Sequence, residues 1–181
     1  MIGEFPNRIR TAACLLPPVW SNDTPRLLDA CTQFVEPWLA EVALQRGYRL
    51  TVCDIAPEEP GVVKVDLTKQ LPWPDRWFRG IICTDTLEHV QHYEMALREF
   101  ARVTEPGGFL MLHLPWRGTP PNLAVETAPQ DPDEDTHHHC WAFGTDLLPK
   151  VDAAGFRLVG GVWSNDDMVF HLSYLYLFAR K

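Results

Sequence analysis

The chain has 181 residues and a mass of 20.7 kDa, a size that suits one domain. Hydrophobic residues make up 46% and charged residues 22%, values typical of a globular protein, which excludes a wholly disordered chain. The 24 acidic and 16 basic residues give a net charge of −8. This balance argues against a nucleic-acid backbone or an anionic membrane surface as the main partner.

Three further features concern the cellular compartment. No apolar run is long enough for a membrane-spanning helix. The N-terminal residues 1–6 lack the basic and then apolar pattern of a secretory signal. The five cysteines are an odd number without a close pair, which argues against a disulfide framework. We therefore expect a cytoplasmic protein, for which a homodimer is one possible assembly.

Regular patterning begins at residue 26. Residues 1–25 are rich in proline and small polar residues and predict an N-terminal arm with at most a short helix at 6–14. Apolar runs predict strands, and apolar residues at helical spacing predict helices. The predicted strands are 26–30, 50–54, 62–66, 80–84, 109–114, 156–163 and 171–179. The predicted helices run from 36 to a stop at Gly47, from 93 to near Pro106, and from a cap at Thr145 to Ala154.

Residues 115–136 differ from the rest because they carry five prolines and an acidic cluster at 131–135. Long loops inside compact domains are often functional. We expect residues 115–143 to form a lid or loop within a single domain that spans 26–181.

The alternation of strands and helices predicts an α/β fold of the Rossmann-like, doubly wound type with a mostly parallel sheet. Only a short polar link separates the last two strands, which predicts an antiparallel C-terminal strand pair. In open parallel sheets, ligands bind beyond the carboxyl ends of the strands.

Acidic residues stand at or near the ends of the first four predicted strands: Asp29, Asp54, Asp66 and Asp85, the last preceded by Thr84. Asp54 follows Asp29 by 25 residues, which is the position of an acid that accepts hydrogen bonds from a ribose. Asp66 can accept from an adenine amino group. The alternative is that these acids only cap the turns that follow.

Three segments occur in a characteristic order: VDLTKQLPWPDRWF at 65–78, IICTDTLEHV at 81–90 and LREFARVTEPGG at 97–108. Together they resemble the central part of class I S-adenosylmethionine-dependent methyltransferases, in a small form similar to the type 11 domain. The resemblance covers 26–115 well and 135–181 more loosely.

The resemblance implies roles for residues at the strand ends. Asp54 would bind the cofactor ribose, Asp66 and the backbone at Leu67 would bind adenine, and Thr84 would lie near the methionine part. Leu87, Glu88 and His89 would line or support the pocket. The full set of cofactor-binding residues expected from the resemblance is Asp29, Ala30, Asp54, Ile55, Asp66, Leu67, Thr84 and Asp85.

The turn after the first strand departs from the family. Residues 30–37 contain no glycine, where the family has a glycine-rich turn whose backbone passes close to the cofactor with positive φ. Side chains such as Phe34 would occupy that space. Either the loop follows another path that leaves a pocket, or the usual cofactor no longer fits.

A second candidate site is the run of three histidines and a cysteine at 137–140, which offers ligands for a divalent transition metal. In an extended chain His137 and His139 face one side and His138 the other. A third ligand would come from Cys140, an acid or His113. The alternatives are a solvated acidic loop and histidines that face a substrate.

The leading hypothesis is methyl transfer from S-adenosylmethionine to a small molecule, with His113 or His139 as the base if the acceptor must lose a proton. A second hypothesis is a methyltransferase fold that performs metal-assisted or acid–base chemistry through residues 137–139. A third is a binding or partner subunit without catalysis. The sequence favours neither a nucleic-acid nor a membrane partner.

Overall fold

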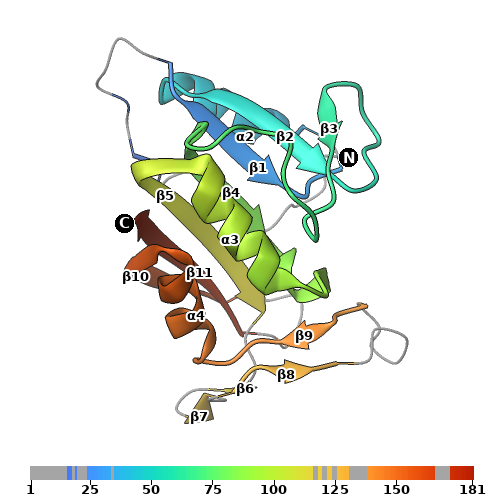
Figure 1. The fold of residues 1–181 in the computed structure, drawn as a ribbon, viewed down its shortest axis with the longest axis vertical. Coiled ribbons are helices and arrows are strands. Elements are labelled where there is room, and N and C mark those ends of the chain that lie inside the picture. The colour runs from blue at the N-terminus through green and yellow to red at the C-terminus, as the bar shows by residue number, and fades with distance from the viewer. Residues whose placement is uncertain are drawn as a thin grey trace.

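The computed structural model describes residues 16–17, 19, 24–33, 35–115, 118–119, 122–123, 126–130, 138–165 and 172–181. Its framework is a seven-stranded sheet in the order β10-β11-β5-β4-β1-β2-β3 (Figure 1). The short helix expected at 6–14 lies outside the described residues.

Most sheet strands begin and end within two residues of the predicted positions, but β5 begins at Thr104, five residues before the predicted start, because the preceding helix ends at Val103 rather than near Pro106. The strands are β1 (Arg26–Ala30), β2 (Arg49–Asp54), β3 (Val62–Lys64), β4 (Phe78–Thr84), β5 (Thr104–Pro115), β10 (Phe156–Asn165) and β11 (Leu172–Arg180). The helices are α2 (Pro37–Gln45), α3 (Tyr93–Val103), α4 (Leu147–Ala154) and the 3₁₀ helix η1 (Leu87–His89).

The five strands β1 to β5 pair in parallel. β11 pairs antiparallel with β5, and β10 pairs antiparallel with β11. The structure therefore confirms the predicted Rossmann-like fold, a mostly parallel sheet with an antiparallel C-terminal strand pair.

The core forms two layers because successive residues of a strand point to opposite faces of the sheet. On one face, Leu27, Ile82 and Met111 pack with residues of α2. On the other face, the neighbouring residues Leu28, Ile81 and Leu110 pack with α3 and α4, the helices drawn in front of the sheet in Figure 1. Leu16, from the described part of the N-terminal arm, is buried in the α2 layer.

The helix ends follow from local chemistry. Pro37 opens α2, where its missing N–H costs nothing. Gly155 closes α4 with a φ of 110°, a conformation that glycine adopts without strain. The expected cap at Thr145 is wrong, because Asp146 precedes the first helical residue. Its carboxylate instead accepts hydrogen bonds from the Thr127 amide and hydroxyl at 2.6 and 2.7 Å.

The described parts of the 115–143 segment contain short strands. β6 (Gly118–Thr119) pairs with β7 (Asn122–Leu123), and β8 (Ala128–Pro129) pairs with β9 (Trp141–Ala142), both antiparallel. β9 lies against η1. Among the described helices, none combines the length and the apolar character needed to cross a membrane.

Candidate functional site

A cavity of about 550 Å³ lies where β1, β2, β3 and β4 end, a volume within the range of small-molecule sites. It is thus at the edge of the sheet where parallel folds bind ligands. Its lining comprises Cys31, Thr32, Gln33, Asp54, Ile55, Val65, Asp66, Leu67, Thr68, Asp85, Thr86, His89 and Val90. Five of the eight expected cofactor residues are in this set.

The end of β2 presents an acid and an apolar side chain to the cavity. Asp54 is buried, and its Oδ1 accepts a hydrogen bond from the Ala56 amide at 2.8 Å. Its Oδ2 has no donor among the described residues and can accept from a ligand. The adjacent Ile55 is 59% exposed and lines the same cavity. This pair suits a ligand with both hydroxyl groups and a flat apolar part.

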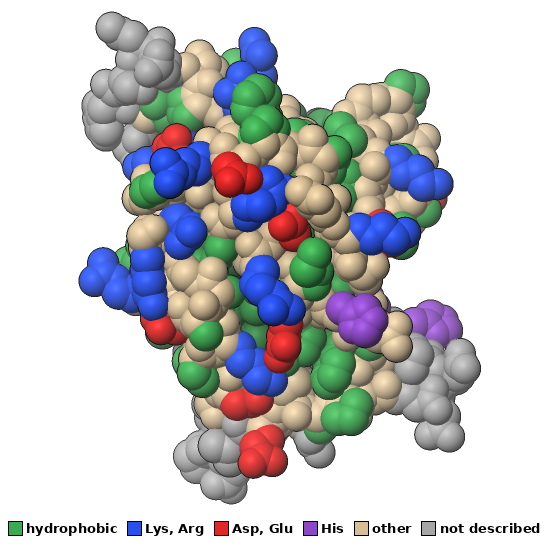
Figure 2. Space-filling model, viewed as in Figure 1, with side chains coloured by type: hydrophobic (Ala, Val, Ile, Leu, Met, Phe, Trp, Pro, Cys, Tyr) green, Lys and Arg blue, Asp and Glu red, His purple; other side chains and the backbone are tan. Residues whose placement is uncertain are grey.

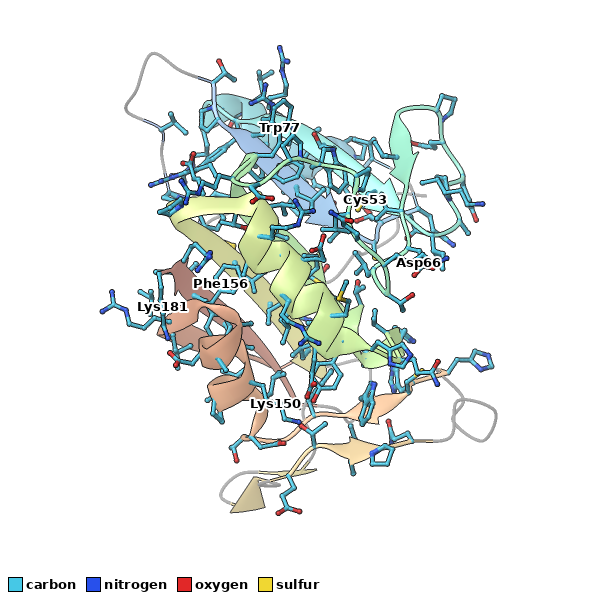
Figure 3. The ribbon with its side chains drawn as sticks, in the orientation of Figure 1. Cys53, Asp66, Trp77, Lys150, Phe156 and Lys181 are labelled. Atoms are coloured by element: carbon cyan, nitrogen blue, oxygen red, sulfur yellow. The ribbon has the colours of Figure 1, made fainter. Side chains whose placement is uncertain are left out.

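The segment after β3 holds a second carboxylate at the cavity, labelled in Figure 3. Asp66 Oδ1 accepts from the Thr68 amide and hydroxyl at 2.9 and 2.6 Å, and Asp66 Oδ2 pairs with Lys69 Nζ at 2.9 Å. The Thr68 hydroxyl, Lys69 and the Thr68 amide lower the pKa of Asp66 to about 2. Asp66 is therefore ionised at neutral pH and fixed in orientation. Leu67 beside it is buried.

Asp29 and Ala30 lie beneath the cavity rather than in its lining. Both are buried in β1. Burial raises the pKa of Asp29 to about 7, although the Thr32 hydroxyl, which donates to Asp29 Oδ2 at 2.9 Å, opposes this change. The position of Asp29 indicates that it supports the turn above it.

The turn after β1 leaves the cavity open although it has no glycine. Cys31 has a φ of 71°, the left-handed conformation that glycine adopts most easily. The amides of Cys31 and Thr32 both donate to the carbonyl of Cys53, at 2.7 and 3.2 Å. The turn therefore contains a side chain at a left-handed position. Phe34, expected to intrude here, lies outside the described residues.

Three thiols surround the base of this turn. Burial raises the pKa of Cys53, labelled in Figure 3, to about 12, and it raises the pKa values of Cys31 and Cys83 as well. A neutral thiol is a poor nucleophile and a poor metal ligand. These cysteines therefore act as small apolar groups, Cys31 in the cavity lining and Cys53 and Cys83 in the core behind it.

The end of β4 carries Thr84 and Asp85. The Thr84 carbonyl accepts from the Thr86 hydroxyl at 2.9 Å, and Thr84 is not in the cavity lining. Asp85 lines the cavity with a φ of 49°, and its amide donates to the His113 carbonyl at 3.0 Å.

The sequence predicts His113 as a possible base. In the structure, however, His113 is fully buried in β5 and does not line the cavity. His113 Nδ1 lies 3.1 Å from Asp85 Oδ1 and donates to it, because an ionised carboxylate only accepts. The structure thus connects His113 to the cavity through Asp85. In the described residues, His113 Nε2 is buried without a hydrogen-bond partner.

The histidine cluster is arranged differently from the expectation. His139 meets Glu88 and His89, and one potential ligand atom from each lies within 4.8 Å of the others. Cys140 is not in this group, and its Sγ donates to the His89 carbonyl at 3.5 Å. The chain is not extended at His138, where φ is 57°. His137 lies outside the described residues.

Some residues that line the cavity were not identified from the sequence. Cys31, Thr32 and Thr68 belong to its lining, and Thr68 also fixes Asp66. The Asp66-Leu67-Thr68 spacing is a recognisable turn pattern in which an Asp accepts from the amide two residues later. No sequence signal indicates the left-handed φ of a cysteine.

A family model described as a methyltransferase domain matches residues 7–160. No curated protein matches the chain. Among solved structures, one similar protein is the 1,6-didemethyltoxoflavin-N1-methyltransferase of Burkholderia thailandensis, solved with 1,6-didemethyltoxoflavin and S-adenosylhomocysteine bound. The TM-score is 0.70 and the identity 16%, over 96% of this chain and 78% of that protein.

Two further structures are similar over most of the chain. An S-adenosylmethionine-dependent methyltransferase of Mesorhizobium loti has a TM-score of 0.70 and 14% identity, over 97% of this chain and 98% of that one. The [4+2]-cyclase SpnF has a TM-score of 0.66 and 17% identity, over 97% and 81%. At such identities these likenesses describe the fold alone.

Proposed function

Because this chain belongs to the methyltransferase domain family, we propose that it transfers a methyl group from S-adenosylmethionine to a small-molecule acceptor. The observation that carries the proposal is the pair of strand-end carboxylates, Asp54 and Asp66, on the wall of one cavity with the exposed Ile55 between them in sequence. Such a set suits a nucleoside, which has hydroxyl groups and a flat base.

The residues present fit this cofactor. Asp54 Oδ2 would accept from the ribose hydroxyls, Ile55 would pack against the adenine, and Asp66 with the backbone at Leu67 would hold its polar edge. Asp85 would lie toward the methionine part, with Thr84 behind it and outside the lining, and Asp29 and Ala30 would support the turn. When bound, S-adenosylmethionine supplies an electrophilic methyl group on a positively charged sulfur.

The protein contributes position and charge rather than covalent chemistry. Methyl transfer requires the acceptor atom in line with the methyl group and the exclusion of water. His139 does not line the cavity, and its ring lies 4.9 Å from that of the cavity residue His89, so it would influence the acceptor through that neighbour. His113 serves as a positioning residue, because its contact with the cavity runs through Asp85.

Two observations support a small-molecule acceptor. The chain has a net charge of −8, which disfavours a polyanionic substrate. The similar Burkholderia thailandensis enzyme holds a small heterocyclic molecule together with S-adenosylhomocysteine.

The fold by itself does not select a reaction, since a similar structure belongs to a [4+2]-cyclase. Methyl transfer remains the preferred function because the carboxylate pair faces the cavity where the cofactor would bind. A binding or partner subunit without catalysis would bind neither the cofactor nor a metal.

Calorimetric titration with S-adenosylhomocysteine tests the proposal. We expect micromolar binding to the unmodified protein and a loss of about 10- to 100-fold in affinity for Asp54→Ala, since a hydrogen bond to a charged group contributes roughly 1.5–3 kcal/mol. The matched control is Glu58→Ala, an exposed acid in the same loop that does not line the cavity. It should bind like the unmodified protein.

The absence of heat and of any thermal shift at millimolar ligand would reject the cofactor assignment. If binding occurs, incubation with methyl-labelled S-adenosylmethionine and a panel of hydroxylated and nitrogen heterocycles measures transfer directly. A protein that binds neither S-adenosylhomocysteine nor a metal would favour the partner-subunit alternative.

A further inference from the structure

Glu88, His89 and His139 form a compact group beside the proposed cofactor cavity. One carboxylate oxygen and one nitrogen from each imidazole lie within 4.8 Å of one another. Glu88 is buried, His139 is half-buried and His89 is exposed and lines the cavity. The group therefore extends from the protein interior to the cavity wall. Figure 2 shows histidine side chains gathered at one edge of the molecular face in view.

The fold fastens together the two segments that carry these residues. The Cys140 amide donates to the Glu88 carbonyl at 2.7 Å. The Trp141 indole N–H donates to the carbonyls of Val90 and Gln91 at 3.1 and 3.2 Å, and its ring packs edge-on against Tyr93. The segment before β9 is thus held against η1, so His139 and Glu88 are positioned by a rigid backbone.

The orientation of His89 is also fixed by a hydrogen bond. Its Nδ1 lies 3.2 Å from the His138 carbonyl, which only accepts, so Nδ1 carries the proton. Nε2 then holds the lone pair that a metal ion needs. An N–H to backbone carbonyl contact on the opposite ring nitrogen is the usual support of metal-ligating histidines. The left-handed φ of His138, 57°, directs its carbonyl toward His89.

The charge of the group favours a cation. A nearby positive charge or metal ion lowers the cost of burying a carboxylate, and Glu88 is buried. The rings of His89 and His139 lie beside it, 4.9 Å apart between centroids. A divalent ion bound by all three side chains neutralises the carboxylate and uses both imidazole lone pairs.

We propose that Glu88, His89 and His139 form a binding site for a divalent transition metal of the zinc class. Two imidazoles and one carboxylate are the ligand set of open zinc and non-haem iron sites, whereas Mg²⁺ and Ca²⁺ prefer oxygen ligands. Three protein ligands leave a coordination position open. Because His89 lines the cavity, an ion bound to its imidazole would lie at the cavity wall.

The location of this site indicates what the ion would do, an assignment that rests on the proposed function. An acceptor oxygen that takes the open position is oriented beside the methyl group, and its pKa falls because the ion withdraws charge. The acceptor O–H releases its proton to solvent. The oxygen lone pair then forms the new bond to the methyl carbon, while the broken S–C bond leaves its electron pair on sulfur. The favoured acceptors are therefore molecules with a hydroxyl group.

Metal titration tests the site without the cofactor or any acceptor. Chelator-treated protein, prepared without a histidine tag, is titrated with Zn²⁺, and Co²⁺ binding is followed by its visible absorption. We expect one equivalent of Zn²⁺ to bind and Mg²⁺ not to compete. Glu88→Gln, His89→Ala and His139→Ala should each reduce Zn²⁺ affinity by about tenfold or more.

The matched control is His92→Ala, an exposed histidine three residues after His89 and outside the group. It should leave Zn²⁺ binding unchanged, and circular dichroism checks that all variants are folded. His137→Ala and Cys140→Ala distinguish the ligand set expected from sequence. Loss of Zn²⁺ in these two variants, with binding retained in Glu88→Gln and His89→Ala, would overturn the assignment.

The outcome is separable from that of the proposed function. Absence of stoichiometric Zn²⁺ binding in a protein that binds S-adenosylhomocysteine would refute the metal site alone. Zn²⁺ binding that depends on His89 and His139, in a protein that does not bind S-adenosylhomocysteine, would retain the site and reject methyl transfer.

Discussion

Two turns border the same cavity, and they are maintained in different ways. The turn after β1, residues 31–33, departs from the family pattern and holds a cysteine in the left-handed region above a buried acid. The segment after β3, residues 65–77, follows the family pattern and is fixed by ionic hydrogen bonds. One wall of the site therefore depends on backbone conformation, and the other depends on paired charges.

The charged contacts of the second segment come from α3. Arg102 donates to both carboxylate oxygens of Glu99 at 2.9 and 2.7 Å, and to the carbonyls of Trp73 and Leu71 at 3.0 and 3.1 Å. It also pairs with Asp75 at 2.8 Å. Glu99 Oε2 accepts from the Leu71 amide at 2.8 Å. This clamp, formed by Glu99 and Arg102, anchors the segment that carries Asp66.

The largest effect is expected from Asp29 in the first turn. Burial raises its pKa from 3.8 to about 7. Between these values the folded chain retains a proton that the unfolded chain has released, so the free energy of unfolding falls as pH rises from 4 to 7. The full change corresponds to at most about 4 kcal/mol, since one pKa unit is about 1.4 kcal/mol. Asp29→Asn should remove this slope and be the more stable protein at pH 8.

Urea unfolding of Asp29→Asn and the unmodified chain at pH 5 and pH 8 measures the difference. Asp66→Asn is the control with the opposite sign. The pKa of Asp66 is lowered to about 2, so its contribution is present above pH 4 and is lost as pH falls through 2. Parallel pH curves for Asp29→Asn and the unmodified chain would show that Asp29 is ionised when folded.

A smaller loss is expected when the clamp of the second segment is broken. Glu99→Ala leaves the Leu71 amide without its acceptor and removes the carboxylate that faces Arg102. We expect a loss of about 3 kcal/mol in the free energy of unfolding. Arg98→Ala, at an exposed position of the same helix, should change it by less than about 0.5 kcal/mol.

The clamp also predicts coupling. Because Glu99 and Arg102 share their hydrogen bonds, the double variant Glu99→Ala/Arg102→Ala should cost less than the sum of the two single variants. Additive losses in urea unfolding would mean that the two side chains stabilise the segment independently.

The fold could be predicted from the sequence because its signals are local. Apolar runs and helical spacing place the sheet strands and the helices α2, α3 and α4, and the order of the motifs indicates the family that the matched domain model confirms. The position of Asp54 and Asp66 on one cavity could also be predicted, because strand ends in a parallel sheet meet at one edge.

Features that depend on distant contacts could not be predicted. His139 meets His89, 50 residues earlier, only because β9 packs against η1. The position of His113 beside the end of β4 follows from the register of β5 against β4, which sets His113 opposite Thr84, the residue before Asp85. Asp146, the residue before α4, is held by hydrogen bonds from Thr127, 19 residues earlier, which the residue types near 145 do not indicate.

The smallest expected change in stability comes from the backbone of the turn after β1. It separates the effect of backbone conformation from that of the thiol. Cys31→Gly and Cys31→Ala both remove the thiol, but only glycine relieves the left-handed φ of 71°. We expect Cys31→Gly to be more stable than Cys31→Ala by about 1 kcal/mol, because the relief of roughly 1–2 kcal/mol is partly offset by the greater entropy of glycine in the unfolded chain. Gly61 also has a left-handed φ but does not line this cavity. Gly61→Ala should lower the free energy of unfolding by a similar amount. If Cys31→Gly is instead the less stable variant, as the entropy of glycine alone predicts, the turn after β1 carries no conformational strain. The contrast between the two walls of the cavity would then rest on the segment after β3 alone.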